Sequence, residues 1–513
     1  MQTYFEKTMS NRHANYFRSI VYLLYLLFQL TQGIVAIAFD MFLNLFLLEF
    51  LLMWVIKTIV SDLVKLGKIA LKMFDEYVAE KNIQPPMRVY IRHYVTDLEI
   101  SETSCGSRGS SEIIQKPDWT KIIFDFMEEK VKTLPEFKQL VQFIAKRYKK
   151  NINELAKGCN EASQTAFWLR TFIQRLIYEK LEDKLSEESI IEYASLFKSE
   201  LELSPTEYKF VCYLQGIFLE PESIKINDHL LIRKPQKEDL EYVRDIFFDI
   251  PRPQYMYVPS SILEVEMFAK DEKECYEYVN RILNSLRLFK LGSIHSKETI
   301  ISKRTAIWPM GSSRSWGHRN YSTFSKYTVK ETQVETFINF INTIEQKLSF
   351  DNEKREYRTL YISIDRYNAA LLEPVDIERK LMTAVMGLES LFTLEKERGE
   401  NAFKLGIRVA KLLSFIGFDA IKVRELTEEA YSYRNKVVHG SYISRDKKRR
   451  ISEILFDILN YLRVSLIIFL LNQNIGKNKM VDMIDKSMIS SNYQERLKAL
   501  LERSIEEFME VLK

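Results

Sequence analysis

The sequence predicts a mainly α-helical protein, and three observations support that fold class. Long segments repeat apolar residues at every third or fourth position, which places them on one face of a helix. Only 12 prolines and 15 glycines occur in 513 residues, which disfavours a loop-rich all-β architecture. Hydrophobic residues make up 46% and charged residues 28% of the chain, a balance typical of a folded protein. A chain of this length exceeds one core, so several domains are expected.

The patterns along the chain divide it into five regions. They are apolar N-terminal helices at 1–80, a linker at 81–117, a helical domain at 118–204, a mixed α/β module at 205–330 and an all-helical domain at 331–513. The linker is centred on Ser101–Ser111, which holds five serines and two glycines. In the mixed module, Asn227 and Asp228 form a hairpin turn between two apolar runs, and Leu263–Met267 alternates as a strand does. Trp168, in the helical domain, is expected in the core.

The N-terminal region contains a stretch with the length of a membrane span. Ser19–Phe39 holds no charged residue over 21 positions, and a helix needs about 20 apolar residues to cross a bilayer. Met41–Ile56 carries only Glu49, and basic residues flank both ends of the whole stretch. This pattern favours a membrane hairpin, with the rest of the chain cytoplasmic or at the cytoplasmic face of the membrane. A pair of buried helices in a soluble bundle is the alternative.

Charge and cysteine usage narrow the class of protein further. The net charge is +4, from 74 basic and 70 acidic side chains, so a nucleic-acid partner must be held by a local patch. The four cysteines stand far apart, without a C-x-x-C pair, and the six histidines lie at no metal-ligand spacing from them. The sequence therefore predicts reduced thiols, no metal centre and no cofactor.

The C-terminal region is predicted to be a bundle of five or six antiparallel helices with short loops. The helical segments are Val334–Leu348, Arg355–Leu371, Val375–Leu391, Ala402–Phe415, Ile421–Val437 and Ser452–Leu471. Gly417 and Gly440 fall just past two of the helix ends, where a left-handed residue is favoured.

Segments of this bundle resemble the Apea-like branch of the HEPN family, the higher eukaryotes and prokaryotes nucleotide-binding domains. The resemblance is carried by AVMGLESLFT at Ala384–Thr393, FKLGIRVAKLL at Phe403–Leu413 and AYSYRNKVVHG at Ala430–Gly440. The last segment contains the R-x4-H motif of the family as Arg434 and His439. Two earlier segments, Gly216–Pro235 and Ile282–Ile294, also look like regions that precede the bundle in these proteins. The resemblance covers roughly Tyr208 to Leu471.

The R-x4-H residue types suit the cleavage of RNA without a metal ion. An imidazole such as that of His439 exchanges protons near neutral pH and can remove the proton of the 2′-hydroxyl. The guanidinium of Arg434 stays charged and can grip two phosphate oxygens. Asn435 can hold the ribose or orient the imidazole. Positions five apart on a helix point about 140° from each other, so Arg434 and His439 share a face only where the helix ends between them. The alternative role for His439 is to cap or brace the helix end.

Further polar residues are candidates for supporting roles. Glu389 follows apolar residues on its helix and needs a cationic partner, which Arg434 or Arg408 could supply; the pair would either brace the bundle or assist catalysis. A basic cluster follows the motif and is expected either to bind RNA or to form an ordinary solvated surface. Its members are Lys447, Lys448, Arg449 and Arg450. The segment Gly311–Asn320 reads as a surface loop whose basic residues and Trp316 could clamp a nucleotide.

The resemblance implies a metal-independent endoribonuclease whose Arg/His site is built at a homodimer interface. It also implies a defence or toxin-type effector, with RNA as substrate and an antitoxin or regulator as a further partner. Two alternatives stay open from the sequence. One is a non-catalytic module that binds nucleotide or RNA, or only dimerises. The other is a membrane-attached structural or sensor protein, which depends on the N-terminal spans.

Overall fold

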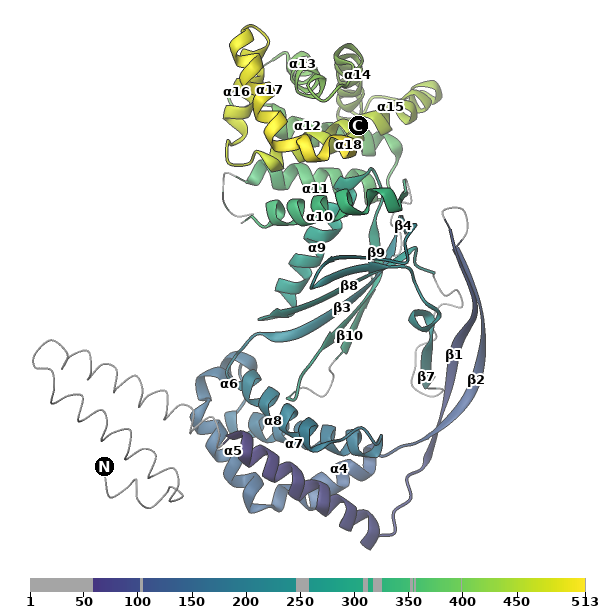
Figure 1. Ribbon diagram of the computed structural model, residues 1–513, viewed down its shortest axis with the longest axis vertical. Coiled ribbons are helices and arrows are strands. Elements are labelled where there is room, and N and C mark those ends of the chain that lie inside the picture. Colours follow the sequence, from purple (N-terminus) through teal and green to yellow (C-terminus); the bar gives the residue numbers. More distant parts are fainter. Residues whose placement is uncertain are drawn as a thin grey trace, which may run out of the picture. The chain divides into compact units, whose positions relative to one another are not determined.

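The computed structural model describes residues 59–512, apart from 102–104, 246–257, 308–311, 317–324, 351–353, 355–356 and 398. The chain is mostly helical, with small sheets in its middle part (Figure 1). Contacts divide it into two compact units, Met1–Ile83 with Ile122–Glu202, and Gln84–Lys121 with Leu203–Lys513. The apolar stretch Ser19–Ile56, for which the sequence favours a membrane hairpin, lies outside the described residues.

In the part of it that the structure describes, the first unit is helical. It comprises a helix at 59–80, α4 (Thr120–Glu129), α5 (Pro135–Arg147), α6 (Lys149–Leu155), α7 (Glu161–Leu181) and α8 (Glu187–Leu201). Asp118 accepts a hydrogen bond from the backbone N–H of Thr120 at 3.0 Å, which satisfies a backbone donor at the start of α4. Trp168 is fully buried, so the prediction of a core role is confirmed.

The predicted linker at 81–117 is wrong, because most of it forms a long β-hairpin. β1 (Met87–Ile100) pairs antiparallel with β2 (Cys105–Pro117), and β1 also pairs with β7 (Tyr242–Asp245). The serines and glycines of β2 stand on an edge strand, where backbone hydrogen bonds form without any contribution from side chains. Polar composition is common on such edges, since it discourages further strand pairing.

The middle of the second unit contains a six-stranded sheet with the order β10-β9-β3-β8-β6-β5. Its strands are β3 (Thr206–Gln215), β5 (Ser223–Asn227), β6 (Leu230–Arg233), β8 (Ser261–Ala269), β9 (His295–Lys303) and β10 (Ser312–Trp316). The Asn227–Asp228 turn and the strand at Leu263–Met267 are confirmed. The predicted loop Gly311–Asn320 is partly wrong, because Ser312–Trp316 pairs antiparallel with β9.

Alternation along the strands gives this sheet two apolar faces. Phe210 and Cys212 of β3 point into the main core with α9 (Glu272–Phe289), whereas Tyr213 packs with Val95 of β1 and Ile262 of β8. The hairpin therefore covers the face opposite to α9, and a strand period of two residues accounts for both contacts. A short parallel pair, β4 (Ile217–Leu219) with β11 (Tyr327–Val329), completes the module.

The C-terminal part is a helical bundle, as the sequence predicts. Its helices are α10 (Val334–Leu348), α11 (Arg358–Leu372), α12 (Ile377–Phe392), α13 (Asn401–Ser414), α14 (Ala420–Val438), α15 (Arg445–Leu471), α16 (Lys477–Ser487), α17 (Ser491–Ile505) and α18 (Met509–Leu512). No strand occurs among the described residues of 378–471. Gly417 and Gly440 have φ of +99° and +68°, which confirms the predicted helix ends.

The bundle and the mixed module share one core, so the predicted boundary at 330 does not separate two hydrophobic interiors. Phe289 of α9 packs edge-on against Phe337 of α10 at 4.9 Å between ring centroids. The buried guanidinium of Arg463 on α15 donates to the carbonyls of Leu288 and Phe289 at the end of α9. A cation at a helix C-terminus satisfies carbonyls that have no partner within the helix.

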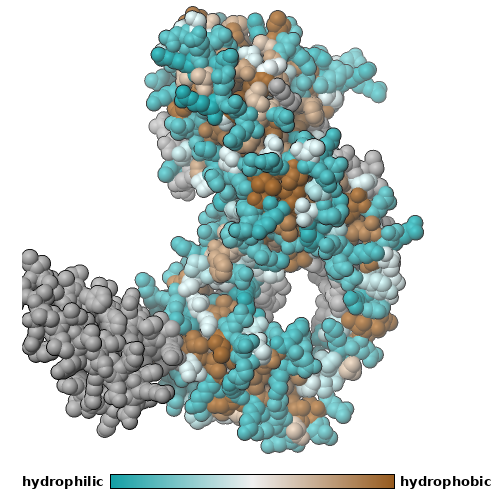
Figure 2. Space-filling view, in the orientation of Figure 1, coloured by the Kyte–Doolittle hydropathy of each residue, from teal (hydrophilic) through white to brown (hydrophobic). Residues whose placement is uncertain are grey.

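Helix α15 forms the centre of the bundle. Among the described residues it is the one helix long and apolar enough to cross a membrane, with a mean hydropathy of 2.1 over its most apolar window. However, 78% of that window is buried inside the protein, and the core helix of a soluble bundle meets the same criterion. The face of the bundle shown in Figure 2 is mostly hydrophilic, with apolar residues interspersed.

Candidate functional site

The site lies at the C-terminal end of α14, and the sequence His439-Gly440 builds that end. The N–H of Gly440 donates to the carbonyl of Val437 at 3.1 Å, and the N–H of Ser441 donates to the carbonyl of Lys436 at 2.9 Å. This pair of bonds, with a left-handed glycine between them, is a Schellman motif. His439 is the capping residue, and its N–H donates to the carbonyl of Asn435 at 3.0 Å. The backbone at His439 is therefore fixed although its side chain is exposed.

An open cavity of 320 Å³ lies over this helix end. It is lined by Glu428, Tyr431, Ser432, Asn435, Lys436 and His439, with Ala402 and Ser441 beside them. Among the described residues, none donates to or accepts from the His439 ring, and the side chain is exposed. The His439 ring is thus available to a ligand, and the residue contributes to the helix end through its backbone.

Arg434 is not among the described residues that line the cavity, although Tyr431, which its guanidinium contacts, is one of them. Its guanidinium forms an ion pair with Glu389 of α12 at 3.2 Å and donates to the side-chain oxygen of Asn435 at 3.1 Å. The guanidinium carbon also lies 5.6 Å from the ring centroid of Tyr431. The helix continues to Val438, so Arg434 and His439 keep the wide angular separation expected for positions five apart. The motif residues are neighbours along the helix without sharing a face.

Glu389 is paired as the sequence indicates, by Arg434 rather than Arg408. The carboxylate is about one-fifth exposed and the guanidinium about one-quarter, so the pair is half-buried between α12 and α14. Burial raises the pKa of the neighbouring Tyr431 phenol, and the charge of Glu389 raises it further. The phenol therefore stays protonated at neutral pH and serves as a hydrogen-bond donor rather than a base.

The expectation that Arg408 supports the site is wrong. Its guanidinium pairs with Glu397 and with Asp485 of α16, and it donates to the carbonyl of Phe392 at the end of α12. Hydrogen bonds from Arg408 lower the pKa of the Glu397 carboxyl to about 2. Because its donors are occupied by these partners and the residue is 4% exposed, Arg408 braces three elements away from the cavity.

Most of the basic cluster forms ion pairs with carboxylates at the protein surface. Lys448 pairs with Glu378 at 2.5 Å, Arg450 pairs with Glu429 at 2.9 Å, and Arg449 pairs with Glu453 at 3.6 Å. Of the four cations, Lys447 alone has no ion pair with a described residue. The positive charge at the start of α15 is therefore compensated by acidic residues of α12, α14 and α15 itself.

Lys436 is the functional candidate that sequence reasoning missed. Its side chain lines the cavity, rests 5.2 Å from the ring centroid of Tyr433 and forms no ion pair with a described carboxylate. The spacing of Ser432, Asn435, Lys436 and His439 places all four on one helix face, and that spacing was readable in the sequence.

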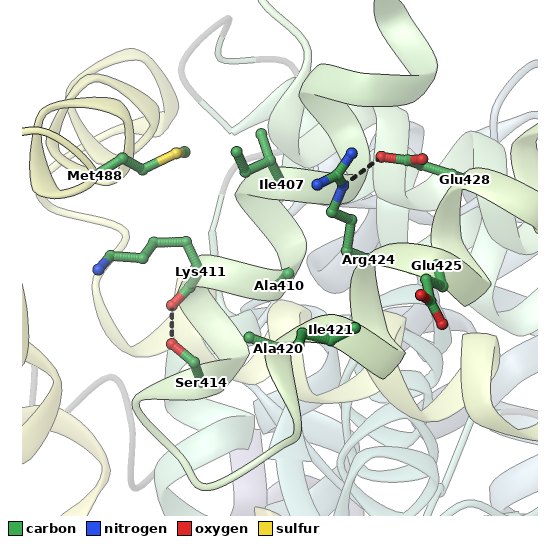
Figure 3. A pocket seen from close by; sticks show the side chains of 10 residues that line it. All are labelled: Ile407, Ala410, Lys411, Ser414, Ala420, Ile421, Arg424, Glu425, Glu428 and Met488. Atoms are coloured by element: carbon green, nitrogen blue, oxygen red, sulfur yellow. Dashed lines mark hydrogen bonds and ion pairs between the residues drawn. The ribbon is translucent and has the colours of Figure 1, made fainter.

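A second, larger cavity of 680 Å³ lies between α13 and the N-terminal half of α14. Figure 3 shows Met488 and Lys411 at the left and Arg424 reaching to Glu428, with which it forms an ion pair at 2.7 Å. Glu428 lines both cavities, so the two are adjacent along α14. The lining carries Lys411, Arg424, Glu425 and Glu428, a balanced set of charges that does not favour an anion.

No group of three or more His, Cys, Asp or Glu side chains that could hold a metal ion occurs in the described part of the chain. The four cysteines are free, and burial raises the pKa of the Cys212 thiol to about 11. That thiol is therefore not a nucleophile at neutral pH.

No protein-family model, curated protein or solved structure matches the chain.

Proposed function

We propose that the protein is a HEPN-type endoribonuclease that cleaves RNA without a metal ion, with His439 as the proton-transferring group. The observation that carries the proposal is the position of His439, which is exposed in the 320 Å³ cavity and free of partners among the described residues. His439 caps α14 through its backbone N–H, so its ring remains free for proton transfer. The resemblance of AYSYRNKVVHG to the family motif indicates that the reaction is the cleavage of RNA.

The chemistry needs the groups in the cavity, the substrate and a proton from solvent water. His439 removes the proton of a ribose 2′-hydroxyl, and the oxygen attacks the adjacent phosphorus. The bond between phosphorus and the 5′-oxygen breaks, and that oxygen takes up a proton from solvent. The products are a 2′,3′-cyclic phosphate and a free 5′-hydroxyl. Side-chain donors near His439 stabilise the charge that develops on the phosphate oxygens.

The proposal includes a homodimer, in which two copies bring their motifs together. Val438 and Tyr442 flank His439 and are 53% and 87% exposed, which supports a contact surface at this helix end. A role as a defence or toxin-type effector, and control by an antitoxin or other regulator, belong to the proposal through the resemblance alone.

Cleavage of single-stranded RNA by the purified full-length chain, in the presence of a chelator, tests the proposal. His439→Ala should lower the rate by about 10²–10⁴ and so abolish detectable cleavage, because a positioned acid–base group is lost. His229→Ala is the matched control, since His229 is an exposed histidine on the β5–β6 turn. Cleavage that survives His439→Ala, or that requires a divalent metal, contradicts the proposal.

The second candidate is a HEPN module that binds RNA or nucleotide without cutting it. The observation in its favour is that Arg434 is tied to Glu389, and that three of the four cations of the basic cluster are paired. RNA binding without cleavage by the wild-type chain would select this function.

A further inference from the structure

We infer that Lys436 is the phosphate-contacting cation of this cavity and that Arg434 is a positioning residue acting through Asn435. The inference rests on the proposed function and departs from the motif-based assignment of the phosphate to Arg434. Its basis is that Lys436, Asn435 and His439 line one cavity on one face of α14. Arg434 points about 100° away from Asn435 around the helix and lies outside that lining.

The charges in the cavity favour Lys436. The lining has one carboxylate, Glu428, whose charge is compensated by Arg424 at 2.7 Å. Lys436 leans on the Tyr433 ring and has no described carboxylate within ion-pair distance. An ammonium group without an anionic partner, three residues from a free histidine on the same face, provides a site for one phosphodiester anion.

Arg434 has a different environment and therefore a different task. One of its terminal nitrogens faces Glu389 and the other donates to Asn435. A guanidinium has only donors, so the Asn435 atom that faces it is the carbonyl oxygen. The amide NH2 group of Asn435 must then point away from Arg434, on the side chain that lines the cavity. Glu389, Arg434 and Asn435 thus form a chain that presents an N–H donor to an acceptor in the cavity.

The ligand that fits this arrangement is a single-stranded RNA phosphodiester. Lys436 contacts a non-bridging oxygen, Asn435 donates to a second acceptor of the same nucleotide, and His439 faces the 2′-hydroxyl. Ser432 adds a hydroxyl on the same face. Lys436 therefore contributes mainly to binding, whereas Asn435 and, through it, Arg434 contribute mainly to the reacting geometry.

Binding is tested with a fluorescent single-stranded oligonucleotide in which 2′-deoxy residues block cleavage, using the full-length chain. Lys436→Gln should weaken binding about tenfold, because a charge-assisted hydrogen bond is lost. It should also reduce the slope of log Kd against log salt by about 0.7, the share of one phosphate on a single strand. Lys422→Gln is the matched control, since Lys422 lies on α14, pairs with Asp457 and lines neither cavity. Equal behaviour of the two variants would overturn the assignment of Lys436.

The role of Arg434 is tested by a double-mutant cycle on cleavage of the corresponding ribo-oligonucleotide. Arg434→Met and Asn435→Ala should each lower kcat about tenfold with little change in KM, and the double variant should lose no more than either single one. The unfolding midpoint of each variant is measured as well. If Arg434→Met does not fold, Arg434→Lys takes its place. The inference is refuted if the losses of kcat in the two single variants multiply in the double variant. It is also refuted if Arg434→Met reduces the slope of log Kd against log salt, because Arg434 would then contact the phosphate.

The ribonuclease function and the phosphate contact of Lys436 are refuted by different results. If the wild-type chain binds the oligonucleotide without cleaving RNA, the ribonuclease function is refuted, and the salt slopes of binding for Lys436→Gln and Arg434→Met still decide which of the two cations contacts the phosphate. If the wild-type chain binds no oligonucleotide, both the function and the phosphate contact are refuted.

Discussion

At the scale of single residues, Gly440 determines where His439 can stand. Its φ of +68° is needed for the Schellman motif, and an added Cβ would meet no atom within 4 Å, so the cost of a side chain is backbone strain alone. Gly440→Ala should lower the free energy of unfolding by about 1 kcal/mol, and Gly440→Asn by less, because asparagine tolerates this conformation better. Urea denaturation measures both variants. Equal losses for alanine and asparagine would contradict this account.

The Arg408 network predicts a dependence of stability on pH. The folded-state pKa of Glu397 is lowered to about 2, below its value in an unfolded chain, so the pair contributes stability that is complete near neutral pH. That contribution is lost as the pH falls from about 4.3 towards 2. Arg408→Met should destabilise the fold by about 3 kcal/mol at pH 7 and by roughly half as much at pH 3, because the Glu397 carboxyl of the folded protein is still mostly ionised one pH unit above its pKa.

Guanidinium-chloride denaturation of wild type and Arg408→Met at both pH values tests this dependence. Arg424→Met is the control, because Arg424 and Glu428 form a partly exposed pair within one helix, worth about 0.5 kcal/mol. A loss for Arg408→Met that stays constant between pH 7 and pH 3 would show that charge pairing is not its cause.

Part of the candidate site was predictable from the sequence. The motif identifies His439, and the apolar residues around Glu389 indicate an inward carboxylate that requires a cation. The choice between Arg434 and Arg408 as that cation was not predictable, because it depends on which helices are neighbours. Lys436 was not predicted because the motif is defined by the number of residues between Arg434 and His439. The residues that line the cavity instead share one face of α14.

At the scale of elements, the helices were largely predictable and the hairpin was not. A helix such as α15 can be predicted from its length and its apolar periodicity, and a polar segment follows its end. β2 carries no such signal, since its burial pattern is almost wholly exposed and its pairing is by backbone. Composition alone therefore describes an exposed edge strand and a linker in the same way.

The hairpin makes a prediction that a linker would not. Val95 of β1 is 6% exposed and packs against Tyr213 and Ile262, so Val95→Asp buries a carboxylate without a partner. It should destabilise the second unit by about 3 kcal/mol. Ile113→Asp on β2 is the control, because Ile113 is 72% exposed and the change should cost less than about 0.5 kcal/mol. Thermal unfolding followed by circular dichroism measures both, and equal midpoints would argue against the packed hairpin.

At the scale of the whole molecule, five regions were predicted from the sequence and two units are found. The segment at 84–121 joins the second unit although residues on both sides of it belong to the first. Sequence patterns change at local features such as Ser101–Ser111, whereas a unit is defined by contacts between distant segments. Phe289 and Phe337 illustrate this, since their ring contact crosses the predicted boundary at 330 and joins the mixed module to the bundle.

At this scale we also expect the whole chain to be attached to a membrane. Ser19–Phe39 has the length and composition of a span, and basic residues flank both ends of Ser19–Ile56, so we propose a hairpin that leaves the rest of the chain in the cytoplasm. The full-length protein should sediment with membranes and resist extraction by high salt, because apolar insertion does not depend on charge. Removal of residues 1–57 should release it into the soluble fraction while the rest of the chain keeps a helical circular dichroism spectrum. The same truncation should leave RNA cleavage intact, since the cavity at His439 belongs to the second unit. Full-length protein that stays soluble without detergent would show instead that these apolar segments pack within the protein.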